Sequence, residues 1–280
     1  MSEDETVKVR RRRTGKADPP MAGRAVGAAG DGLPLIHMTA VGAAREIVRT
    51  GSIDTRRCPV FDRDLVYFFV GRPAYRLKHG DDKSNYISMF PCLFMGRGTT
   101  LGAPYHVYPL DTGGLMAGVF GGHPDPHVYL EDYELEPNLA SAAGHIAWAF
   151  EDLQAYYNGD LRPGLSETLA RWDEVGVAFT SLARLASRQS NTKPDLRAST
   201  VEVAYSRPVS LKDAVDYAIL PAQYLEDQHG PNSKFIERLT ELGIAWEVYD
   251  WQPHKTPNQY NDEINQLVRR RLFGPKATAE

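Results

Sequence analysis

A glutamate within a run of strand-forming residues is the first candidate for chemistry in this sequence. Residues 199–205 read STVEVAY. Side chains alternate along a strand, so Glu202 shares one face with Thr200 and Ala204. A buried carboxylate without a partner would be strongly disfavoured, so this face is expected to border water or a site. An exposed glutamate on an edge strand is the simpler alternative for this segment taken alone.

Two further residues with chemically useful side chains stand in or just after predicted strands. His37 lies in the strand candidate of residues 33–39, and Arg72 comes after the β-forming run of residues 64–70. Strand ends and the loops that follow them are where scaffolds present functional groups. A planar guanidinium binds carboxylates and phosphates through paired hydrogen bonds, and an imidazole can donate or accept one. Taken singly, such a histidine is more often a core residue and such an arginine a surface turn residue.

The elements that must position these residues follow no regular alternation. Apolar residues at helical spacing predict a helix over residues 41–50, with Gly51 as its stop. Further helices are predicted over residues 139–157, 165–187 (with a break near Gly176) and 233–242, and further strands over residues 86–95, 216–221 and 245–249. Strands predominate in the outer parts and helices in the middle, which favours an α+β fold over a doubly wound sheet.

Length and composition set the class of protein. The 280 residues, 42% of them hydrophobic and 10% aromatic, are enough for a packed core. With 32 basic and 36 acidic residues the formal charge is -4, which argues against a protein that binds nucleic acid with its whole surface. Two cysteines predict neither a disulfide framework nor a Cys-rich zinc site. Neither a signal peptide nor a membrane anchor is visible, so a cytoplasmic location with no membrane partner is expected.

The composition also predicts how the chain is divided. Residues 1–32 are rich in charge, glycine, alanine and proline, and predict a disordered basic arm. Four consecutive arginines at residues 10–13 could grip a phosphate backbone, although solvated charge is the simpler interpretation. Residues 33–280 are predicted to form a single domain, with a helical insertion at about residues 135–190.

Together the three candidate residues resemble the diphtheria-toxin-like and poly(ADP-ribose)-polymerase-like ADP-ribosyltransferase superfamily. Its first strand ends in His-x-Thr or His-Gly-Thr, as residues 37–39 (His-Met-Thr) do here, and its catalytic glutamate lies on a late strand. The sequence is most similar to the DNA-targeting toxin branch of bacterial toxin-antitoxin systems, in which an aromatic strand runs into an Arg-x-Pro element. Residues 67–73, YFFVGRP, look like that element with one residue fewer between arginine and proline. The similarity covers residues 33–75 and 195–222.

The resemblance implies an α+β split β-sandwich with a cleft for NAD, which serves as co-substrate. Breaking the bond between nicotinamide and ribose produces an oxocarbenium-like ribose. The resemblance makes Glu202 the catalytic carboxylate that stabilises this cation. Arg72 is carried over with two roles left open, binding the pyrophosphate and activating the acceptor.

The same resemblance assigns the residues that bind NAD. His37 would hydrogen-bond the ribose hydroxyls, and Thr39 would support the same bound molecule. Met38 would offer backbone contacts to the nicotinamide carboxamide. Tyr75 or Tyr67 could stack on the nicotinamide ring, although Tyr67 suits strand packing equally well.

The resemblance implies a mono-ADP-ribosyltransferase that modifies a macromolecular acceptor, nucleic acid or protein, as a toxin or phage-defence effector. In this superfamily the loop before the catalytic strand touches the acceptor, which here is the loop of residues 189–197. Protein-arginine modifiers carry Glu or Gln two residues before the catalytic glutamate, so Thr200 argues against arginine as the target. An NAD glycohydrolase and a non-catalytic ligand-binding or interaction module are the alternatives. A cognate antitoxin or immunity protein is left open.

A metal site is a weaker alternative. His106, His123 and His127 lie in the middle of the chain together with two aspartates, Asp111 and Asp125. The prolines between His123 and His127 exclude the helical histidine pair of zinc proteases, so no metal is expected.

Overall fold

The computed structural model describes residues 9, 11, 21–24, 30, 32–74, 86–187, 195–226, 233–252 and 254–275. The chain forms two compact units, each assembled from three stretches of sequence. Unit 1 comprises Met1–Leu33, Arg56–Val70 and Ala103–Ser206, and unit 2 comprises Pro34–Thr55, Gly71–Gly102 and Arg207–Glu280. The boundaries expected from the sequence, an arm over residues 1–32 and one domain over residues 33–280, stay predictions.

Unit 1 contains an antiparallel sheet in which the strand that carries Glu202 is central. Its strands are β3 (Arg56–Cys58), β4 (Arg63–Val70), β6 (His106–Tyr108) and β7 (Glu202–Tyr205). β7 pairs with β4 on one side and with β6 on the other, so that Glu202 lies opposite both Phe69 and Tyr108. The alternative of an exposed glutamate on an edge strand is therefore excluded.

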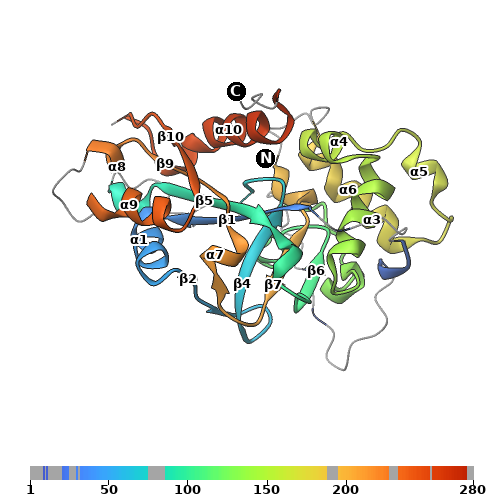
Figure 1. Ribbon diagram of the computed structural model, residues 1–280. Coiled ribbons are helices and arrows are strands. Elements are labelled where there is room, and N and C mark those ends of the chain that lie inside the picture. Colours follow the sequence, from blue (N-terminus) through green and yellow to red (C-terminus); the bar gives the residue numbers. More distant parts are fainter. Residues whose placement is uncertain are drawn as a thin grey trace. The chain divides into compact units, whose positions relative to one another are not determined.

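The helices of unit 1 follow one another in the middle of the chain. They are α2 (Thr112–Met116), α3 (Leu139–Phe150), α4 (Leu153–Asn158), α5 (Leu165–Thr168) and α6 (Glu174–Ala183), with short 3-10 turns η1 (Ala22–Arg24), η5 (Leu130–Tyr133), η6 (Arg184–Ala186) and η7 (Leu196–Ser199). Figure 1 shows α3, α4 and α6 beside one another in the green and yellow part of the chain. His145 of α3 packs edge-to-face on Phe179 of α6, with ring centroids 4.8 Å apart.

Two helices predicted in this region are each divided in two at a place that was not predicted, so these predictions were wrong in that respect. The helix expected over residues 139–157 is interrupted at Glu151, which adopts a positive φ of 76°. The Asp152 side chain then accepts a hydrogen bond from the Ala155 N–H and begins α4. The helix expected over residues 165–187 breaks ahead of Glu174, so Gly176 lies inside α6 rather than at the break.

Where the structure describes the N-terminal segment, that segment contacts the rest of unit 1. The Val9 and Met21 side chains are buried. The Arg11 Nε lies 2.8 Å from Oε1 of Glu131, and Arg24 pairs with Asp173 at the start of α6. At these positions the segment is held by burial and by ion pairs.

Unit 2 is built on a four-stranded sheet. Its strands follow the order β10 (Ala245–Tyr249), β9 (Tyr217–Pro221), β5 (Pro91–Arg97) and β1 (Pro34–Ala40). β10 pairs in parallel with β9, and the other two contacts are antiparallel. The remaining elements are α1 (Val41–Thr50), α7 (Leu211–Ala214), α8 (Gln223–Glu226), α9 (Ser233–Glu241), α10 (Asn261–Phe273), the small pair β2 (Ser52–Ile53) and β8 (Val209–Ser210), and the 3-10 turns η3 (Ile87–Met89), η4 (Gly98–Thr100) and η8 (Pro257–Tyr260). Helices and largely antiparallel strands agree with the α+β class expected from the sequence.

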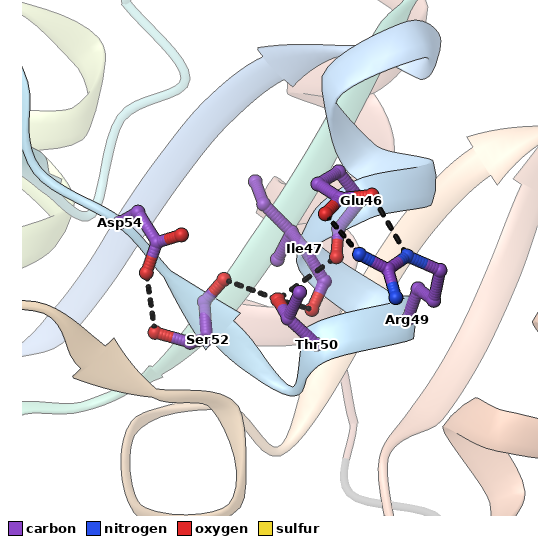
Figure 2. A network of polar contacts seen from close by, with 6 residues as sticks. All are labelled: Glu46, Ile47, Arg49, Thr50, Ser52 and Asp54. Atoms are coloured by element: carbon purple, nitrogen blue, oxygen red, sulfur yellow. Dashed lines mark hydrogen bonds and ion pairs between the residues drawn. The ribbon is translucent and has the colours of Figure 1, made fainter.

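The element that follows β1 ends as its sequence predicts. α1 spans Val41–Thr50, and Gly51 takes the left-handed conformation with φ 72° while its N–H donates to the Ile47 carbonyl. The Thr50 hydroxyl donates to the Glu46 carbonyl at 2.9 Å (Figure 2). The Ser52 hydroxyl donates to Asp54, and Glu46 pairs with Arg49. These contacts fix the path of the chain between α1 and β2.

The strand expected over residues 86–95 is only half a strand. Its first part is the 3-10 turn η3, and β5 begins at Pro91 and continues to Arg97. Proline lacks an N–H and is accommodated at the first residue of a strand. At Gly96 a Cβ would lie 1.8 Å from the Ala214 carbonyl oxygen, so this position of β5 requires glycine. Within the described ranges, no helix is both long enough and apolar enough to cross a membrane.

Candidate active site

Glu202 is buried within unit 1, where polar groups contact its carboxyl group. Its side chain is buried, with 2% of the residue's surface exposed. The Thr112 hydroxyl donates to Oε1 at 2.6 Å, and the Thr112 backbone N–H donates to Oε2 at 3.3 Å. Nε2 of His106 lies 3.2 Å from the same Oε1. Each carboxylate oxygen therefore has a fixed partner, which satisfies the expectation that a buried strand glutamate needs one.

Aromatic rings pack around His106. Phe61 packs on the imidazole with ring centroids 4.3 Å apart, and the rings of Tyr108, Tyr105 and Tyr67 lie at 5.0, 5.4 and 5.8 Å. The Tyr67 hydroxyl donates to Sγ of Cys58 at 2.9 Å, which favours packing over the ring-stacking role considered for it. Buried, closely packed side chains have a low effective dielectric constant around them, so charges among them interact more strongly than in water.

Burial raises the pKa values of two neighbouring carboxyl groups, those of Glu202 and Asp111. Desolvation raises the pKa of Glu202 to about 8, against the lowering effect of the two hydrogen bonds from Thr112. Desolvation, followed by the charge of Glu202, raises the pKa of Asp111 to about 6, while the Gly114 N–H and Arg197 act in the opposite direction. Shifted and separated pKa values of neighbouring acids are typical of functional sites.

The segment that precedes β7 is hydrogen-bonded to the residue next to Thr112. The Asp111 N–H donates to the Arg197 carbonyl at 3.0 Å, and the Arg197 guanidinium pairs with Asp195 at 2.7 Å. The Thr200 hydroxyl donates to the Leu196 carbonyl at 2.6 Å, so it is engaged locally. Asp195, Leu196 and Arg197 are the end of the loop predicted to touch the acceptor, and residues 189–194 of that loop lie outside the described residues.

Unit 2 carries the other predicted site residues. His37 and Thr39 are half-buried on one face of β1, whereas Met38 is buried on the opposite face. Arg72 is fully buried. It follows Gly71, which has φ 63° and donates its N–H to the Pro34 carbonyl at 2.8 Å.

The hydrogen bond from the Gly71 N–H to the Pro34 carbonyl places Arg72 beside the first residue of β1. His37 lies three residues further along that strand, about 10 Å at the rise of an extended chain. His37, Met38, Thr39 and Arg72 are thus brought together in unit 2, and Glu202 belongs to unit 1. Tyr75 lies outside the described residues.

Two residues that contact Glu202, His106 and Thr112, are not indicated as its partners by the sequence. His106 was considered only as a metal ligand, and Thr112 was not considered. The Asp-Thr-Gly-Gly sequence from Asp111 onward is a recognisable helix start, since the Asp111 side chain accepts the Gly114 N–H. The contact with Glu202 spans 90 residues of sequence, however, and no local pattern reveals it. In the described parts of the chain, no three His, Cys, Asp or Glu side chains gather in a way that could hold a metal ion.

No protein-family model and no curated protein matches this chain. Among solved structures, it is similar to Thermus sp. 2.9 DarT in complex with NAD+, at 11% identity and a TM-score of 0.36, covering 78% of this chain and 95% of that one. It is also similar to the same protein in complex with ADP-ribosylated ssDNA, at 10% identity and a TM-score of 0.34, covering 81% and 95%.

Proposed function

We propose that this protein is an NAD-dependent mono-ADP-ribosyltransferase that transfers ADP-ribose to a macromolecular acceptor, nucleic acid or protein. The observation that carries the proposal is the arrangement around Glu202. A carboxylate on a central strand is buried, fixed at both oxygens by Thr112 and approached by His106. A carboxyl group that served packing alone would gain little from such a position, because burial makes its ionised form costly and raises its pKa to about 8.

The arrangement suits the cleavage of the bond between nicotinamide and ribose. The reacting ribose carbon gains positive charge as this bond breaks, and a nearby carboxylate stabilises that charge. In a buried environment the attraction is stronger than in water. The reactive form is the Glu202 that has already lost its proton to solvent. Burial raises the pKa of Glu202 to about 8 and so makes this ionised form costly in the free protein, and the developing cation stabilises it.

The residues of unit 2 fit the binding of NAD. Arg72 offers a buried guanidinium, which suits a pyrophosphate, and its role in acceptor activation remains part of the proposal. His37 and Thr39 present polar side chains on one face of β1 for the ribose hydroxyls. Met38 and Tyr75 complete the proposed NAD site, through the Met38 backbone and the Tyr75 ring.

Incubation with NAD labelled in the ADP-ribose moiety tests the proposal. We expect release of nicotinamide and label on single-stranded DNA, RNA or protein added as acceptor. Glu202→Gln removes the charge with little change of shape and should abolish both signals. Glu134→Gln, at another buried glutamate of unit 1, is the matched control and should retain them.

The outcomes separate the alternative functions. Nicotinamide release with free ADP-ribose as the sole labelled product would make the protein an NAD glycohydrolase. No NAD turnover by the wild-type protein would favour a non-catalytic binding or interaction module. Turnover retained in full by Glu202→Gln would refute the assignment of Glu202. A role as a toxin or phage-defence effector predicts that expression arrests bacterial growth and that Glu202→Gln relieves the arrest.

A further inference from the structure

Thr112 is placed to control Glu202 without reacting itself. It gives Glu202 two hydrogen bonds, one from its hydroxyl to Oε1 and one from its backbone N–H to Oε2. A carboxylate held at both oxygens by one residue is restricted in rotation as well as in position. Thr112 is itself buried, so neither hydrogen bond competes with bulk water.

The turn that contains Thr112 is fixed on both sides. Asp111 caps α2 by accepting the Gly114 N–H at 3.0 Å. The Asp111 N–H donates to the Arg197 carbonyl in η7, which leads into β7 and Glu202. The start of α2 is therefore bonded to β7 at two places. Thr112 bonds to Glu202 itself, and Asp111 bonds to the segment that precedes β7.

We infer that Thr112 is the positioning residue of the site, which holds the Glu202 carboxylate in the orientation and protonation state that cleavage of the ribosyl bond requires. This inference rests on the proposed function and names the residue on which the catalytic carboxylate depends. The hydroxyl stabilises the ionised carboxylate, whereas burial opposes ionisation. Loss of the hydroxyl therefore both frees the carboxylate to rotate and makes it harder to ionise.

Several other groups face Glu202. They are His106 and Tyr108 from β6, Tyr67 and Phe69 from β4, and Asp111 ahead of α2. Asp111 is acidic, and its charge opposes ionisation of Glu202. The Thr112 hydroxyl donates to Oε1 of Glu202 at 2.6 Å.

Three variants test the inference through steady-state kinetics with NAD. Thr112→Val keeps the shape and removes the hydroxyl, and should lower kcat about ten- to a hundredfold, as expected for a lost hydrogen bond to a charged group, with KM for NAD changed less than about twofold. Thr112→Ser keeps the hydroxyl and should restore most of the rate. Thr180→Val is the matched control, because the Thr180 hydroxyl of α6 donates to its own helix at the Val177 carbonyl.

The pH profile supplies a readout that general damage to the fold would not move. In the wild-type protein, kcat/KM should fall below about pH 8 as Glu202 becomes protonated. In Thr112→Val this limb should move to higher pH by about one unit, and in Thr112→Ser it should stay in place. A Thr112→Val enzyme with the wild-type rate and pH limb would overturn the inference, as would a Thr112→Ser enzyme as damaged as Thr112→Val.

Failure of the proposed function can be told apart from failure of this inference. Glu202 can be titrated by NMR with ¹³C-labelled glutamate, with Glu202→Gln used to assign its signal, and this requires no activity. Thr112→Val should raise the Glu202 titration midpoint whether or not NAD is turned over, and an unchanged midpoint would overturn the role of Thr112. Absence of turnover by the wild-type protein, with the midpoint shift present, would refute the transferase and leave the control of Glu202 by Thr112 established.

Discussion

Replacement of Glu202 by glutamine should stabilise the protein, and the gain should depend on pH. Burial raises the pKa of Glu202 to about 8 from an ordinary value of 4.5. Between these two values the folded protein retains a proton that the unfolded chain has lost. The wild-type protein therefore loses stability as the pH rises from about 4.5 to about 8. Glutamine does not titrate, so the variant escapes this loss.

The size of the effect follows from the shift. The interval from pH 4.5 to pH 7 covers about 2.5 pH units, and each unit is worth about 1.4 kcal/mol, so the variant should gain about 3 kcal/mol relative to wild type over this interval. Glutamine can keep the existing contacts, because its carbonyl oxygen can accept the Thr112 N–H at the Oε2 position. Its NH₂ group can then donate to Nε2 of His106 and to the Thr112 hydroxyl at the Oε1 position.

Urea unfolding followed by far-UV circular dichroism at pH 4.5, 5.5, 6.5 and 7 measures this difference. Glu46→Gln is the control, because Glu46 is exposed on α1 and Arg49 lowers its pKa (Figure 2). Its stability difference should have the opposite sign and be small, since the wild-type carboxylate gains from its ion pair as the pH rises. A Glu202→Gln difference that stays flat from pH 4.5 to pH 7 would refute the conclusion that burial raises the pKa of Glu202.

Two further predictions concern the scaffold. Burial lowers the pKa of His145 to about 3, so the wild-type protein should lose stability as the pH falls below 6.5. His145→Phe does not titrate, and its stability relative to wild type should increase by about 3 kcal/mol between pH 7 and pH 4. A stability difference in urea unfolding that does not change with pH would contradict the lowered pKa of His145. Gly96→Ala should destabilise unit 2 by at least about 2 kcal/mol, because its Cβ would collide with the Ala214 carbonyl. Gly243→Ala, where φ is 72° and the space is open, should cost about 1 kcal/mol; equal melting temperatures of these two variants would refute the steric argument.

Elements with local signals were predictable from the sequence. α1 begins and ends as its apolar spacing and Gly51 indicate, and β10 covers the predicted residues 245–249. The break of the helical region at Glu151 was not predictable, because a non-glycine residue with positive φ is stabilised by its surroundings. Gly176 was misread as a helix break, although it lies where the Asp173 side chain caps the first turn of α6.

The sequence by itself determined that a glutamate stands in a strand, that His37 and Thr39 share one face of another strand, and that Arg72 follows a glycine turn. These facts depend on alternation and on local turn chemistry, which a few consecutive residues encode. Only the tertiary structure decided that the Glu202 strand is paired on both sides, that its carboxyl group is buried, and that Thr112 and His106 contact the carboxylate. Burial and the partners that satisfy it come from segments far apart in the chain, so the raised pKa of Glu202 is a property of the folded protein.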